Sequence, residues 1–201
     1  MKLKNSLTTN LIVVITGFYI IATYAPKITW GGIPLQYHLL LVNQLPLTDG
    51  TFIGVGSGEW WRVFTVVLTH ASWLHIGMNM LVLFQLGNIV EHFYGVGRYA
   101  FILILSTFFA SGLSLILDPE TQLSVGASGM IFGLFGAMVV AGKKMPVDYK
   151  QVLGYLVINL IIGFTLPNID WHAHVGGLLG GALAAFILRA YPRRRAPQLW
   201  E

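Results

Sequence analysis

A serine and two histidines stand near one end of three apolar segments, each at a similar distance from a charged residue. The separation is 16 or 15 residues in the three pairs His75–Glu91, Ser128–Lys143 and His174–Arg189. With a rise of about 1.5 Å per helical residue, each side chain would lie roughly 22–24 Å from the charged end. The hydrocarbon of a bilayer is about 30 Å thick, so all three would lie beneath the opposite surface at one depth. Ionisable groups inside a membrane are costly and usually functional, and this set predicts a hydrolytic site.

Ser128 belongs to the run Gly126-Ala127-Ser128-Gly129 and begins a short apolar segment that ends at Gly142. As a helix of about 22 Å, this segment would start inside the membrane, and the chain before it would dip inward. The first N–H groups of a helix have no partner within it, and they suit an anionic intermediate. Taken alone, Ser128 fits a helix N-cap better than a nucleophile, with the glycines serving helix packing.

His174 strengthens the catalytic interpretation of Ser128. Each of the two residues is followed by glycines at helical spacing, namely Gly177 and Gly181 after His174, and Gly129, Gly133 and Gly136 after Ser128. Faces of small residues let two membrane helices approach closely. An imidazole beside the hydroxyl would act as general base and then as acid toward the leaving amine. The alternative is a core histidine bonded to a backbone carbonyl.

Asp170 precedes His174 by four residues and could in principle orient the imidazole as a third member of the site. We expect it near water, and therefore predict a dyad of Ser128 and His174. His172 points to a different helical face than His174 does, because the two residues are not three or four positions apart.

His75 and Asn79 are four residues apart, so they share a face of the second apolar segment. Both side chains can donate hydrogen bonds, and such donors stabilise an oxyanion. Hydrogen bonding between helices is the alternative role, and it is common for buried asparagine. We expect His70 to support the chain before this segment, and Glu91 to tie helices together.

The elements that would carry these residues are membrane helices. Hydrophobic residues make up 55% of the 201 and charged residues 10%, whereas a soluble domain has about 25% charged residues. The chain has no cysteine, which excludes disulfides, thiolate metal ligands and a cysteine nucleophile. A net charge of +4 could suggest nucleic acid, but the basic residues cluster in loops, where they set membrane topology.

We predict an all-α polytopic membrane protein with one domain over residues 1–201. Six apolar segments are near the length that spans a bilayer, at about 7–25, 73–94, 99–117, 128–142, 152–166 and 173–190. The outer loop 26–72 is rich in tryptophan, a residue that favours the membrane interface, so we expect it to be partly embedded. The sequence leaves self-association open.

An even number of spans places both termini on one side of the membrane. Ten of the twelve basic residues then share that side, namely Lys2, Lys4, Arg98, Lys143, Lys144, Lys150, Arg189 and Arg193–Arg195. The positive-inside rule makes this side cytoplasmic. A cleaved signal peptide that ends near Ala25 is an alternative for the first segment, but Pro26 directly after the cut disfavours processing.

With these residues in view, the chain resembles the rhomboid family of intramembrane serine proteases over nearly its whole length. Five motifs occur in order: Trp61-Arg62, then His70, His75 and Asn79 with the spacing H-x4-H-x3-N, then Gly87 with Glu91, then Gly126 to Gly129, and Ala173-His174 with Gly176-Gly177. The resemblance implies a six-span bundle with a long first outer loop.

The resemblance also implies roles. Ser128 would be the nucleophile and His174 its base, while His75, Asn79, Gly126 and the Ser128 amide would stabilise the oxyanion. His70, Trp61, Arg62 and Glu91 would give structural support. The implied reaction is cleavage of single-pass membrane proteins in or beside their transmembrane helix, without cofactor, metal or ATP. A multi-pass position in a bacterial plasma membrane follows as our expectation.

Three other functions remain as alternatives. His75 and His174 could ligate haem iron, or bind a metal together with His70, but this leaves Ser128 unexplained. A transporter would show repeated halves, and we find none in the sequence. A relative that binds without catalysis would differ in activity alone. For an active protease we expect the fifth segment or the outer loop to move aside for substrate.

Overall fold

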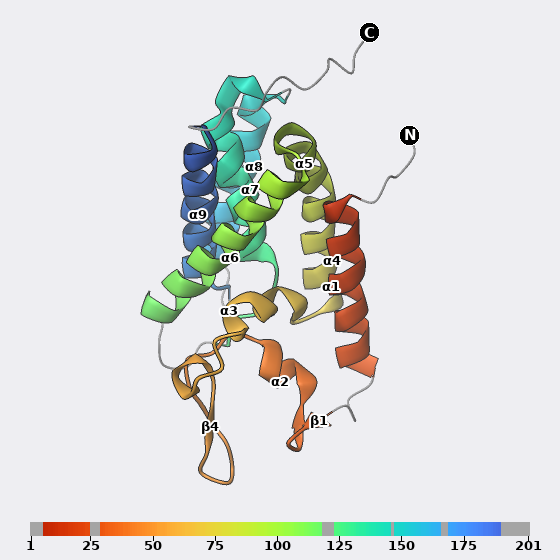
Figure 1. The fold of residues 1–201 in the computed structure, drawn as a ribbon, viewed down its shortest axis with the longest axis vertical. Coiled ribbons are helices and arrows are strands. Elements are labelled where there is room, and N and C mark those ends of the chain that lie inside the picture. The colour runs from red at the N-terminus through yellow and green to blue at the C-terminus, as the bar shows by residue number, and fades with distance from the viewer. Residues whose placement is uncertain (1–5, 25–28, 118–122, 146, 166–168, 190–201) are drawn as a thin grey trace.

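The apolar segments form helices that stand side by side in a bundle (Figure 1). Residues 29–72, called the outer segment below, lie across one end of this bundle. The computed structural model describes residues 6–24, 29–117, 123–145, 147–165 and 169–189. Its long helices are α1 (Leu7–Tyr24), α4 (Trp73–Val82), α6 (Val96–Leu117), α7 (Ser128–Ala141), α8 (Tyr149–Thr165) and α9 (Trp171–Arg189). A π-helical turn, η3 (Leu83–Gly87), joins α4 to α5 (Asn88–Tyr94) without a break. A short 3-10 turn, η4 (Gly142–Lys144), follows α7.

Four helical stretches in the described part of the chain are long and apolar enough to cross a membrane. They are Leu7–Tyr24, Trp73–Tyr94, Val96–Leu117 and Trp171–Arg189. α7 and α8 are shorter, with 14 and 17 residues. The mostly helical membrane bundle is thus confirmed, while the count of six spans stays a prediction. The basic residues near the two termini, Lys2, Lys4 and Arg193–Arg195, lie outside the described residues.

Side-chain caps explain two helix starts that differ from the predicted ones. α8 begins at Tyr149 rather than Val152, because the Asp148 carboxylate accepts a hydrogen bond from the Lys150 N–H over 2.9 Å. α9 begins at Trp171, because Asp170 accepts one from the Ala173 N–H, also over 2.9 Å. A capping oxygen satisfies an N–H group that has no partner in the first turn, and this adds residues to the helix.

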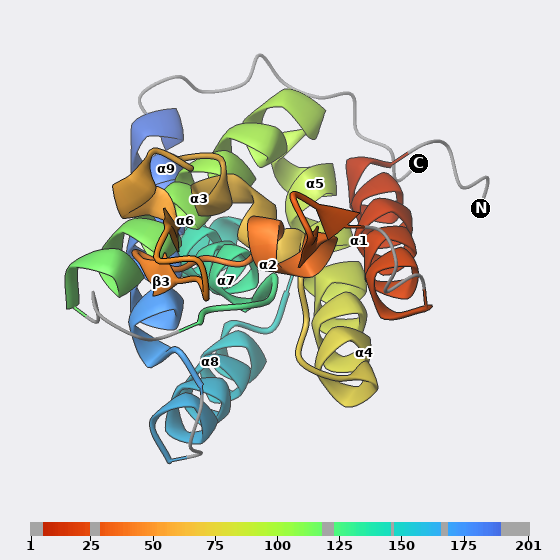
Figure 2. The ribbon, with the colours of Figure 1, turned by 90° about the horizontal axis from the view of Figure 1, so that it is seen from below.

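α7 lies in the middle of the bundle, where other helices surround it when the molecule is seen from below (Figure 2). Most of its residues are buried. Its glycines allow this close packing, because a Cβ at Gly136 would collide with the Leu178 carbonyl of α9. α6 packs against the same helix, and the Ser106 hydroxyl occupies the space that a Cβ at Gly133 would need.

The outer segment contains short strands, which an all-α prediction does not include. β1 (Thr29–Trp30) pairs antiparallel with β2 (Ile33–Pro34) through a turn at Gly31 and Gly32. The φ angles of these glycines, +60° and +81°, suit a two-residue hairpin of type I′. β3 (Leu45–Pro46) pairs likewise with β4 (Phe52–Ile53).

Short helices complete the outer segment and face the end of the bundle (Figure 2). They are α2 (Leu35–Leu39), η1 (Val55–Ser57), α3 (Arg62–Thr65) and η2 (Val66–Leu68). Arg62 is fully buried and donates from Nη1 to the carbonyls of Tyr37 and Leu40, over 2.5 and 2.8 Å. Its Nε and Nη2 donate to the Glu59 carboxylate over 2.8 and 2.6 Å. One guanidinium therefore joins α2 to α3.

Candidate active site

Ser128 lies where an extended stretch of chain turns into α7. Leu41 and Ser124 exchange two backbone hydrogen bonds, of 3.0 and 2.9 Å, which hold this stretch against the outer segment. The chain turns at Gly126, whose φ of +115° is a conformation that residues with a Cβ rarely adopt. Ser128 is the first residue of α7, so it lies beside N–H groups that have no partner within the helix.

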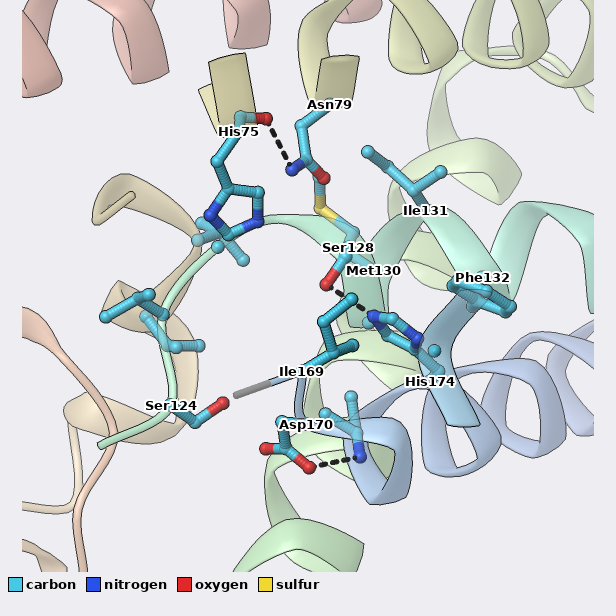
Figure 3. Close-up of a pocket in the computed structure, with 18 of the residues that line it drawn as sticks. His75, Asn79, Ser124, Ser128, Met130, Ile131, Phe132, Ile169, Asp170 and His174 are labelled. Carbon is cyan, nitrogen blue, oxygen red and sulfur yellow. Dashed lines mark hydrogen bonds between the residues drawn. The ribbon is translucent and has the colours of Figure 1, made fainter. Parts of the chain in front are cut away.

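Ser128 Oγ and His174 Nε2 lie 2.9 Å apart, although the residues stand on different helices (Figure 3). His174 is buried, and its ring stacks on Phe132 with centroids 4.2 Å apart and planes at 11°. When the hydroxyl donates to Nε2, the proton of the neutral ring is on Nδ1, which has no hydrogen-bond partner among the described residues. The pair has the geometry of a nucleophile and its general base.

His75 and Asn79 lie on α4 and line the same cavity as Ser128 (Figure 3). The Ala71 N–H faces His75 Nδ1 at 3.4 Å, so the proton of the neutral ring is on Nε2. Asn79 donates one N–H of its amide to the His75 carbonyl over 2.9 Å, which leaves its second N–H for another acceptor. The two side chains thus supply two hydrogen-bond donors beside the serine.

Gly126, which the resemblance places at the oxyanion, lies at the turn before Ser128. Its N–H already donates to the Val66 carbonyl over 3.2 Å. The contribution of Gly126 is its shape, since a Cβ there would lie 2.9 Å from His75 Nε2. Glycine at this position lets the His75 ring approach the turn before Ser128.

His70 contacts the same turn through the backbone N–H of Ala127. The Ala127 N–H donates to His70 Nε2 over 3.4 Å. Burial lowers the pKa of His70 to about 3, and the neighbouring His75 ring adds to this effect, so His70 is neutral at pH 7 and can accept. The centroids of the two imidazoles are 5.1 Å apart.

The other residues expected to give support do not line the cavity. Trp61 donates from Nε1 to the His38 carbonyl over 3.1 Å, next to Arg62 in the outer segment. The Glu91 carboxylate accepts from Leu7 N, Thr8 N and Thr8 Oγ1, over 2.7, 2.9 and 2.7 Å. Glu91 thereby caps the start of α1 from α5.

Asp170 does not bond to the free nitrogen of His174. Its Oδ1 accepts from the Ala173 N–H over 2.9 Å, and its Oδ2 accepts from the Ser114 hydroxyl over 2.5 Å. His172 lies 4.0 Å from the same carboxylate and packs its ring on Trp171. Among the described residues, the serine–histidine pair therefore has no third member of a triad.

Two residues of α8 contribute to the site and were not expected from the sequence. Asn159 lines the cavity and donates from Nδ2 to the Tyr155 carbonyl over 2.7 Å. Gly163 lies against the catalytic candidate, since a Cβ there would be 3.0 Å from His174 Nδ1. The four-residue spacing of Asn159 and Gly163 puts both on one helical face, and that spacing is the sequence signal that could have identified them.

The cavity beside Ser128 has a volume of about 490 Å³. α4 lines it with His75, Met78 and Asn79, and α8 lines it with Asn159 and Gly163. This size is within the range of ordinary ligand sites. In the described residues, no group of three His, Asp or Glu side chains could hold a metal ion.

Comparisons with known proteins identify relatives of the chain. Residues 57–191 match the Rhomboid domain family. Rhomboid protease GluP of Bacillus subtilis is 34% identical over 81% of this chain, which spans only 35% of the length of GluP. Putative rhomboid protease YdcA of the same organism is 30% identical, over 84% of this chain and 86% of its own length. RHOMBOID-like protein 6, mitochondrial, of Arabidopsis thaliana is 33% identical over 93% of this chain and 70% of its own.

Proposed function

Because this chain belongs to the rhomboid family of serine-type intramembrane endopeptidases, we propose that it hydrolyses peptide bonds with Ser128 as nucleophile and His174 as base. The single observation that carries this assignment is the 2.9 Å contact between Ser128 Oγ and His174 Nε2. That contact lies beside a cavity and at the start of a helix, where N–H groups favour negative charge. The chain is an integral membrane protein, so its substrates are membrane proteins.

In the first half of the reaction, Ser128 Oγ attacks the substrate carbonyl carbon while its proton passes to His174 Nε2. The carbonyl oxygen becomes an anion, and His75 Nε2–H, Asn79 Nδ2–H and the Ser128 N–H are the donors for it. His174 then gives its proton to the amide nitrogen, which leaves as an amine. The other half of the substrate stays on Ser128 as an ester.

In the second half, water attacks the ester carbonyl and His174 takes a proton from that water. The resulting intermediate collapses, Ser128 recovers its proton from His174, and the new carboxyl end leaves. His174 suits both directions of proton transfer, because Phe132 holds its ring while Nε2 faces the hydroxyl. The cavity provides room for the water molecule.

The substrates that fit this site are single-pass membrane proteins, cut in or near their transmembrane segment. A peptide bond in a membrane helix is protected by its own hydrogen bonds, so the segment must unwind before attack. Glycine or proline in the substrate lowers the free-energy cost of that unwinding. The cavity beside Ser128 is lined by side chains of both α4 and α8, which supports entry of a substrate from the lipid through the space between these helices.

α7 and α8 complete a six-span topology with both termini in the cytoplasm. The basic residues Lys143 and Lys144 follow α7, and Arg189 ends α9, so the described basic ends lie on one side. The positive-inside rule supports a cytoplasmic position for that side. A bacterial plasma membrane is the proposed location, supported by relatives in Bacillus subtilis.

The decisive experiment is cleavage of a model single-pass substrate in liposomes by the wild type, Ser128→Ala and His174→Ala. Both variants are expected to lose cleavage. His75→Ala and Asn79→Ala are expected to reduce the rate by about 10²–10³, the usual effect of removing one oxyanion donor. Normal cleavage by Ser128→Ala would refute the assignment of the nucleophile.

A further inference from the structure

The catalytic histidine of this chain lacks the usual means of orientation. In serine proteases with a triad, an aspartate accepts a hydrogen bond from the second ring nitrogen and holds the imidazole in place. Here His174 Nδ1 is buried and has no hydrogen-bond partner in the described part of the chain. Stacking on Phe132 restrains the plane of the ring, but it does not set where the backbone of His174 lies. Another contact must locate the start of α9.

Asp170 makes that contact with both of its carboxylate oxygens. Oδ1 accepts from the Ala173 N–H over 2.9 Å, which caps the first turn of α9. Oδ2 accepts from the Ser114 hydroxyl of α6 over 2.5 Å, across 56 residues of sequence. Figure 3 shows Asp170 on the far side of His174 from α4, turned toward the backbone of α9 rather than toward the imidazole.

The anchor residue is buried and stands at the end of a closely packed helix seam. Ser114 is 3% exposed. Along the same seam, a Cβ at Gly176 would collide with the Phe109 carbonyl, and a Cβ at Gly180 would lie 2.7 Å from the Leu105 carbonyl. α6 and α9 therefore have little freedom to slide, and the Ser114–Asp170 bond extends this restraint to the first turn of α9.

His174 follows directly after that first turn. Its N–H faces the Asp170 carbonyl at 3.4 Å, and its Nε2 lies 2.9 Å from Ser128 Oγ. A shift of the turn would therefore move the imidazole away from the hydroxyl. Misplacement of a catalytic group by 1 Å can reduce a rate by about 10²-fold.

We propose that Asp170 is a positioning residue, which fixes the first turn of α9 to Ser114 of α6 and so places His174 against Ser128. The inference rests on the proposed function, because it assigns to Asp170 the orientation of the proposed base. Asp170 acts through hydrogen bonds to the Ala173 N–H and the Ser114 hydroxyl.

The test compares Asp170→Ala, Asp170→Asn and Ser114→Ala with a matched control, Asp148→Ala. Asp148 also caps a helix, since it accepts from the Lys150 N–H at the start of α8. It follows the basic turn Gly142–Lys144, whereas Ser128 begins the opposite end of α7. The variants are reconstituted with a model single-pass substrate to measure kcat and KM. A fluorophosphonate probe measures the reactivity of Ser128 without the need for substrate entry, and thermal unfolding measures stability.

Asp170→Ala is expected to lower kcat by about 10²-fold with little change in KM, and to slow probe labelling in parallel. Asp170→Asn is expected to recover most of both rates, because an amide oxygen caps a helix and its N–H₂ can donate to Ser114 Oγ. Ser114→Ala, which loses one of the two bonds, is expected to lie between Asp170→Ala and the wild type. Asp148→Ala is expected to keep the wild-type kcat and labelling rate.

A wild-type kcat in Asp170→Ala would overturn the inference, and so would an equal loss in Asp148→Ala. Equal losses in Asp170→Asn and Asp170→Ala would also overturn it, because charge rather than hydrogen bonding would then be the cause. Ser128→Ala in the same assay separates this inference from the proposed function. If Ser128→Ala cleaves normally, the nucleophile is wrong; if it is inactive while Asp170→Ala is normal, only the positioning role fails.

Discussion

In the group of helices α6, α7 and α9, the glycines of α7 and α9 have no room for a side chain, whereas the glycines of α4 and α8 mostly face open space. A Cβ at Gly177 of α9 would collide with the Gly129 carbonyl of α7. By contrast, a Cβ at Gly77 of α4 or Gly154 of α8 would meet no atom within 4 Å. Close packing of small residues holds membrane helices together, so the first group of helices is the rigid part of the bundle.

The residues proposed for the reaction are divided between the closely packed helices and the loosely packed ones. The nucleophile and base candidates, Ser128 and His174, both stand in the rigid part. The proposed side-chain donors to the oxyanion, His75 and Asn79, come from α4, and α8 lines the cavity with Asn159 and Gly163. Many side chains of α8 are half exposed, as at Ile158 and Phe164, with 54% and 55% exposure. We therefore expect a substrate to displace α8 without separating the serine from the histidine.

Gly177→Ala is expected to have the largest effect, because it acts on the rigid part. The added methyl would push α7 and α9 apart, and overpacking of this kind typically destabilises by about 1–3 kcal/mol. Cleavage and probe labelling should both be lost, since Ser128 and His174 would separate. Unfolding in detergent and cleavage in liposomes measure the two effects. Gly112→Ala on α6, where a Cβ meets nothing within 4 Å, is the control.

A covalent link between α4 and α8 tests whether these two helices must separate to admit a substrate. The chain has no cysteine, so Met78→Cys with Asn159→Cys gives one pair of thiols, both of which line the cavity. Joining them with a cleavable bifunctional reagent should abolish cleavage of a transmembrane substrate, while a small fluorophosphonate still labels Ser128. Cutting the linker should restore cleavage. Full cleavage by the linked protein would show that the entry is elsewhere.

Gly163→Ala tests the one glycine of α8 that touches the rigid part. The new Cβ would lie 3.0 Å from His174 Nδ1, so the imidazole or α8 must shift by a few tenths of an ångström. We expect kcat to fall roughly tenfold, less than for a full 1 Å displacement. Thermal stability should change little, because α8 can move. An unchanged kcat would mean that α8 shifts to make room for the new methyl group while the imidazole of His174 stays in place.

Gly154→Ala should have the smallest effect and the opposite sign. Its Cβ would meet no atom, and replacing glycine by alanine in a helix interior stabilises by roughly 0.5–1 kcal/mol. Unfolding measurements should therefore show a slightly more stable protein with cleavage close to that of the wild type. Destabilisation by Gly154→Ala would contradict the view that this face of α8 is unpacked.

The sequence predicted the long helices better than the outer segment that precedes α4. The stretch Trp73–Tyr94 and the start of α7 at Ser128 have the predicted bounds, because apolar length and glycine are local signals. The hairpins of the outer segment were not predicted, since their strands have only two residues each. Strands of that length carry no periodicity that a sequence could reveal.

In the candidate site too, the sequence predicted local features but not contacts between distant residues. Residue types and one-turn spacings identified Ser128, His174, His75 and Asn79, and the family resemblance joined them into one hypothesis. The bond of the Gly126 N–H to Val66 was missed, because its partners lie 60 residues apart and on different elements. The contact of Gly163 with His174 was missed for a similar reason.

Apolar length and the order of the motifs were enough to identify a rhomboid membrane protein and to select its candidate site residues, since each is a property of neighbouring positions. The rotation and depth of one helix relative to another depend on the packing of both surfaces together. Only the folded chain could therefore decide that Asp170 bonds to Ser114 instead of His174, and that His174 Nε2 faces the hydroxyl of Ser128.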